Sequence, residues 1–198
     1  MRYVLGNLVL AIALAVCLPG VCAAQAGSAT AANSSTTTQN RQLSPEGVDR
    51  IKKEVRHQLV MQPFYSVFDN FEYKVDPDGT VTLMGQVVDP TLKSDAEKSV
   101  KHIEGVERVV NDIEVLPVSP NDDRIRRATY RAIYGNDVLN MYALRAVPPI
   151  HIIVNGGHVS LDGVVARPMD KQVAEMQAKS VPGVFSVTDN LQVENQNK

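Results

Sequence analysis

The chain has 198 residues, with 20 lysines and arginines against 22 aspartates and glutamates, so its formal net charge is −2. This balance argues against a general nucleic-acid-binding protein, because such proteins are normally basic overall. Both cysteines, Cys17 and Cys22, lie near the amino terminus inside a predicted leader. We therefore expect no disulfide framework and no thiol chemistry in the mature protein.

Residues 1–26 have the layout of a secretory signal peptide, in which Arg2 precedes an apolar run from Leu8 to Leu18 and a stretch of small residues. The run is short compared with the roughly 20 apolar residues of a membrane span. We expect cleavage and export to the periplasm or envelope, with a retained anchor or a lipoprotein as the alternatives. Loss of Arg2 leaves 19 basic against 22 acidic residues, a net charge of −3. The polar residues 27–43 are predicted to form a disordered linker.

A repeat organises the rest of the chain. Residues 81–115 and 159–193 both begin with Val-x-Leu-x-Gly-x-Val, and both carry Gly-Val before a closing valine-rich segment, at a constant offset of 78 residues. A repeat of this length indicates two copies of one small domain. We place the first at residues 44–117 and the second at residues 121–195.

Apolar periodicity and turn residues predict the elements of the first copy. In chain order these are a helix opened by Ser44-Pro45-Glu46 and ended by Pro63, strands at 71–75 and 81–87, a helix from Pro90 to Gly105, and a strand at 109–115. This order predicts an α+β domain, in which helices pack on one face of a three-stranded mixed sheet.

The second copy repeats the order. The predicted elements are a helix capped by Asp122-Asp123, a short helical turn at 138–144, strands at 150–154 and 159–165, a helix at 168–181, and a strand at 187–193. Ile125, Thr129 and Ile133 mark the apolar stripe of its first helix. Outside that stripe lies the densest cluster of one charge sign in the chain, formed by Arg124, Arg126, Arg127 and Arg131. The candidate site consists of Arg126, Arg127, Tyr130, Arg131 and Tyr134.

We find no sequence motif that supports catalysis. There is no Gly-x-Ser-x-Gly elbow and no phosphate-binding glycine loop followed by lysine. The four histidines, His57, His102, His151 and His158, show no spacing typical of metal ligands. We therefore expect neither an enzyme, a metal site nor a cofactor.

The pattern shared by residues 81–115 and 159–193 resembles the BON domain, also called the transport-associated domain. Tandem BON proteins of the bacterial cell envelope include an osmotically inducible periplasmic type and an outer-membrane lipoprotein type. The resemblance implies a non-catalytic module linked to phospholipid surfaces, envelope integrity and stress tolerance. In the lipoprotein type, lipid contact is associated with the first helix of the second BON domain, the helix that carries the arginine cluster here.

Two functions remain open at this point. In the first, one face of the helix binds anionic phospholipid through Arg127, Tyr130, Arg131 and Tyr134. The competing structural interpretation is that these arginines pair with nearby acids or line the contact between the two domains. In the second, the protein is a periplasmic protein-binding or chaperone-like module that presents sheet edges or the segment 64–71 to envelope proteins. Neither the lipid, the protein partner nor the oligomeric state follows from the sequence.

Overall fold

The computed structural model describes residues 42–145 and 147–194. The predicted signal peptide and residues 27–41 of the predicted linker lie outside this part. The first copy consists of α1 (Pro45–Val60), β1 (Asn70–Val75), β2 (Thr80–Val87), α2 (Pro90–Lys101), β3 (Arg108–Asn111) and β4 (Glu114–Val115). The second consists of α3 (Pro120–Tyr134), the 3-10 helix η1 (Asn140–Leu144), β5 (Ile150–Asn155), β6 (His158–Val165), α4 (Pro168–Lys179) and β7 (Ser186–Val193).

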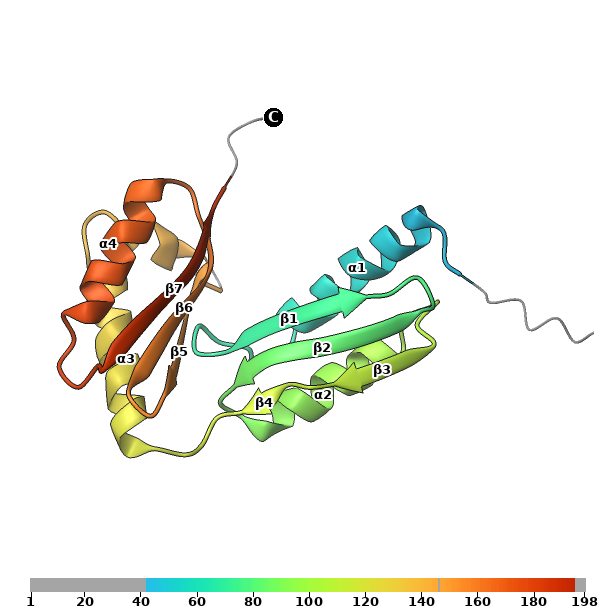
Figure 1. The fold of residues 1–198 in the computed structure, drawn as a ribbon, viewed down its shortest axis with the longest axis horizontal. Helices are drawn as coiled ribbons and strands as arrows, with labels where there is room; N and C mark the ends of the chain where they lie inside the picture. Colours follow the sequence, from blue (N-terminus) through green and yellow to red (C-terminus); the bar gives the residue numbers. More distant parts are fainter. Residues whose placement is uncertain (1–41, 146, 195–198) are drawn as a thin grey trace, which may run out of the picture. The chain divides into compact units, whose positions relative to one another are not determined.

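Each copy has its own mixed sheet (Figure 1). In the second copy, β6 pairs antiparallel with β5 and parallel with β7. In the first copy, β2 pairs antiparallel with β1 and parallel with both β3 and β4. The predicted α+β domain of helix, strand, strand, helix and strand is therefore confirmed, although the third strand of the first copy is divided at Asp112 and Ile113.

In each copy, both α-helices cover one face of the sheet, and the apolar residues of the helices and of that face form a core. In α1 every fourth residue from Ile51 to Leu59 is buried, and in α2 the same spacing buries Leu92 to Val100. Both sets belong to one apolar cluster with the inner face of the sheet. The second copy has an equivalent cluster, which also includes Val67 from the connection between α1 and β1.

The first helix of each copy begins at a proline that follows a capping serine. Ser44 caps α1 as predicted, because its hydroxyl accepts a hydrogen bond from the Gly47 amide at 3.2 Å. The predicted cap of α3 is wrong: the helix begins at Pro120, and the Ser119 hydroxyl accepts from the amide of Asp122 at 3.2 Å. The Asp122 carboxylate is buried and instead accepts hydrogen bonds from the amides of Gly156 and Gly157, both at 2.9 Å. It thereby ties the helix to the β5–β6 turn.

The glycines of the repeated motif have a common backbone role. Gly85 and Gly163 have φ values of 107° and 131°, which non-glycine residues rarely adopt. A β-carbon at position 85 would overlap the backbone carbonyl oxygen of Asn70, and one at position 163 would overlap that of Pro149. The motif therefore requires glycine because the neighbouring backbone comes too close for a side chain.

Corresponding glycines also align the first helices of the two copies. Gly105 lies against Ile51 and the Arg50 side chain, whereas Gly183 lies against Ile125 and the Arg124 side chain. The offset between α1 and α3 is therefore 74 residues, although it is 78 residues from β2 onward. The second copy has four more residues between its first helix and the sheet.

Candidate functional site

The exposed face of α3 is a line of arginines. Between residues 123 and 134, the exposed residues are Arg124, Arg127 and Arg131. Their spacing of three and four residues places them along one side of the helix. Ile125, Thr129 and Ile133 point the opposite way and are fully buried. We call Arg124, Arg127 and Arg131 the arginine face.

The charges of the arginine face are not neutralised by neighbouring acids. Arg124 donates a hydrogen bond to the side-chain oxygen of Asn121 at 2.9 Å. Within residues 42–145 and 147–194, no ion pair involves Arg124, Arg127 or Arg131. Within the described residues, the three guanidinium groups therefore have no acidic partner and can bind an external anion such as phosphate.

Two of the five predicted site residues are buried, which corrects their predicted place on an open surface. Arg126 is 3% exposed; it donates to the Asp123 carboxylate at 2.6 Å and to the Val154 carbonyl oxygen at 2.7 Å. Tyr134 is 6% exposed, and its hydroxyl donates to the Ile150 carbonyl at 2.6 Å. Burial raises the pKa of Tyr134 above its ordinary value, so the hydroxyl remains a donor. Both side chains attach α3 to β5.

Tyr130 lies at the border of the arginine face and is half-buried. Its ring centroid is 4.8 Å from that of Tyr134, and the ring of Phe68 meets it edge-on at 6.2 Å. Tyr130 therefore joins the arginine face to an aromatic cluster that includes a residue of the first copy.

Sequence reasoning placed Arg124 in the charge cluster but not among the site residues. The structure adds it, because the line from Arg127 and Arg131 continues to it. Helical spacing also contained the signal that excludes Arg126, because this residue lies three positions before Thr129 and seven before Ile133, two members of the predicted apolar stripe. Asp123, three residues before Arg126, is the ion-pair partner that such a buried arginine needs.

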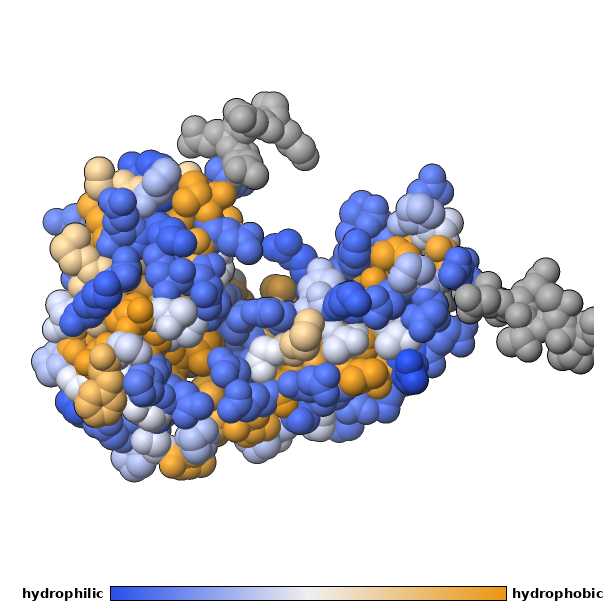
Figure 2. Space-filling view, viewed as in Figure 1, coloured by the Kyte–Doolittle hydropathy of each residue, from blue (hydrophilic) through white to orange (hydrophobic). Residues whose placement is uncertain are grey.

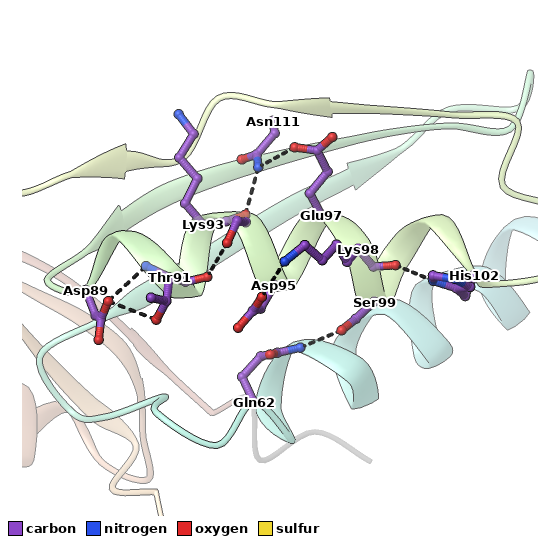
Figure 3. Close-up of polar contacts among 11 residues, drawn as sticks. Gln62, Asp89, Thr91, Lys93, Asp95, Glu97, Lys98, Ser99, His102 and Asn111 are labelled. Carbon is purple, nitrogen blue, oxygen red and sulfur yellow. Dashed lines mark hydrogen bonds and ion pairs between the residues drawn. The ribbon is translucent and has the colours of Figure 1, made fainter.

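The helices of the first copy have a different charge pattern. Close-range partners hold several of the polar groups on α2. Lys98 pairs with Asp95 at 3.0 Å (Figure 3), and Lys101 pairs with Glu97. The Asn111 amide donates to Glu97 at 3.0 Å. On α1 the exposed bases alternate with Glu46, Asp49 and Glu54. On α3 the two acids are held within the fold, since Asp122 is buried and Asp123 pairs with Arg126.

The BON domain family model matches residues 47–117 and, separately, residues 121–195. The chain belongs to the BON domain family. BON domains are generally non-catalytic and occur in envelope-associated proteins. The arginine face therefore lies on the first helix of the second BON domain. In the part of the chain that the structure describes, no helix is long and apolar enough to cross a membrane.

Two solved structures similar to this chain come from Chlamydia trachomatis and concern CdsD, described as a structural protein of its type III secretion system. One is 11% identical and has a TM-score of 0.27, with 73% of this chain and 91% of that chain covered. The other, the CdsD C-terminal domain, is 12% identical with a TM-score of 0.26, covering 71% and 96% respectively. No curated protein matches the chain.

Proposed function

We propose that this tandem BON protein binds anionic phospholipid surfaces through the arginine face and Tyr130, and that this binding supports envelope integrity and stress tolerance. The observation that carries the proposal is the line of three exposed arginines opposite the buried face of α3, none of which forms an ion pair within residues 42–145 and 147–194. Guanidinium groups bind phosphate well, and a tyrosine beside them can lie at headgroup depth.

The expected interaction is weak and electrostatic. Each base near an anionic membrane contributes about 1 kcal/mol, so the arginine face contributes about 3 kcal/mol. On the face of the molecule in Figure 2, hydrophilic residues divide the hydrophobic surface into separate patches. Such a surface offers no broad apolar area for adsorption, so electrostatic attraction contributes more than apolar burial there.

Co-sedimentation of the mature chain with vesicles tests the proposal. Binding should rise with the fraction of phosphatidylglycerol in phosphatidylcholine vesicles and fall as salt is raised from about 50 to 500 mM, since salt screens exposed charges. Absence of binding to vesicles of any composition would overturn the proposal and favour a protein partner. In cells, loss of the arginine face should reduce growth under osmotic stress.

A further inference from the structure

The segment from Phe64 to Asp69 connects two elements of the first copy but packs against the second. Val67 is buried in the apolar core of the second copy, and its carbonyl oxygen accepts a hydrogen bond from the Ile152 amide at 2.8 Å. The Tyr65 hydroxyl lies 3.3 Å from Nε2 of His151, with the two rings stacked at 5.5 Å. These contacts hold the segment beside β5 and α3.

Phe64 is the exception in this segment, because 65% of the residue is exposed. It lines a surface depression of about 440 Å³ together with Phe68 and Arg127. A large apolar side chain and one arginine of the arginine face therefore line the same depression. An apolar side chain beside free cationic groups is the combination found on surfaces that bind membrane interfaces.

The acids that line the same depression are engaged within the fold. Asp123 pairs with Arg126 at 2.6 Å. Asp69 is buried and accepts hydrogen bonds from the Ser66 amide and hydroxyl and from the Val88 amide. Asp89 caps α2 by accepting from the Thr91 amide at 2.8 Å. Their negative charge is partly offset by these donors, while Arg127 has no acidic partner in the described residues.

We propose that Phe64 is the apolar anchor of the membrane contact: its ring enters the boundary between headgroups and acyl chains of an anionic bilayer while Arg127 binds a lipid phosphate. This rests on the proposed function, and it makes the binding surface a joint product of both copies. The first copy supplies the inserting ring and the second supplies the charge.

The natural chain contains no tryptophan, so one introduced tryptophan reports on its own surroundings. In the Phe64→Trp variant, tryptophan emission should shift to the blue on addition of equimolar phosphatidylglycerol and phosphatidylcholine vesicles. Lipids brominated near the headgroup end of the acyl chain should quench it. Phe185→Trp is the matched control, since Phe185 is also a strongly exposed phenylalanine, at 76%. Its emission should stay that of a water-exposed indole.

Affinity provides a second readout. Partial immersion of a phenylalanine ring in the membrane interface should raise vesicle affinity by about tenfold. Phe64→Ser should therefore weaken vesicle binding by about tenfold, whereas Phe185→Ser should weaken it by less than about twofold. Vesicle binding without a blue shift at position 64, or equal shifts at positions 64 and 185, would overturn the anchor but leave the arginine face in place. If the natural chain does not bind vesicles, the proposed function fails first, and the anchor fails with it.

Discussion

Replacement of buried Arg126 should destabilise the protein far more than replacement of its exposed neighbour, Arg127. Arg126→Ala removes a charged donor from the buried Val154 carbonyl oxygen and from Asp123, whose side chain is 42% exposed. Loss of a charged hydrogen bond to a buried acceptor costs about 1.5–3 kcal/mol, and loss of the packed side-chain stem adds to this. The Nε atom of Arg126 has no partner in the described residues, which limits the gain from its burial. We expect a loss of about 3 kcal/mol.

Thermal unfolding of the mature chain, followed by circular dichroism at about 222 nm, measures this loss. A change of about 3 kcal/mol corresponds to a fall in Tm of about 6–12 °C for a chain of this size. Arg127→Ala is the matched control and should change stability by less than about 0.5 kcal/mol, because Arg127 is exposed and makes no ion pair with the residues that the structure describes. Equal effects of the two substitutions would refute the assignment of Arg126 to the interior.

Three further substitutions or conditions test the fold around this helix. Asp122→Ala should cost about 3 kcal/mol by removing two hydrogen bonds from a buried carboxylate, and amide hydrogen exchange in the β5–β6 turn should accelerate; unchanged exchange would contradict this. Gly163→Ala should cost about 3 kcal/mol or more in urea unfolding, through its positive φ and the overlap with the Pro149 carbonyl. Burial lowers the pKa of His151 below its ordinary value, against smaller opposing effects of nearby carbonyl groups and carboxylates. The unfolded chain then binds a proton at His151 more tightly than the folded chain does. The stability that neutral His151 provides is therefore complete above about pH 6.5 and is lost as pH falls through the lower folded-state pKa. His151→Gln should remove this part of the pH dependence of stability.

The local spacing of apolar and capping residues was sufficient to predict the order of helices and strands in each copy. Buried residues four apart predicted α1, the alternation around Leu83 and Leu161 predicted the paired strands, and Ser44 predicted the first helix start. These signals are readable because each depends on neighbours within a few residues. The Asp122 side chain was misassigned for the opposite reason, since its partners lie 34 and 35 residues away in a turn.

The candidate site was less accessible from sequence. A cluster of arginines shows charge density, but which members face water depends on the rotation of the helix against its sheet. The structure places Arg127 and Arg131 outside and Arg126 inside, a difference of one position along the chain. The place of Phe64 beside Arg127 depends on contacts that link residues more than 60 positions apart, and no local pattern reports them.

Charge reversal on the arginine face tests the central claim most directly. The triple variant Arg124→Glu, Arg127→Glu and Arg131→Glu should lose co-sedimentation with phosphatidylglycerol vesicles while its circular dichroism and Tm remain close to those of the natural chain. The control is a triple variant of three exposed bases on α1, Lys52→Glu, Lys53→Glu and Arg56→Glu, which changes the net charge equally and should largely retain binding. Binding by the α3 variant at the level of the natural chain, or equal loss in both variants, would contradict a lipid site on α3.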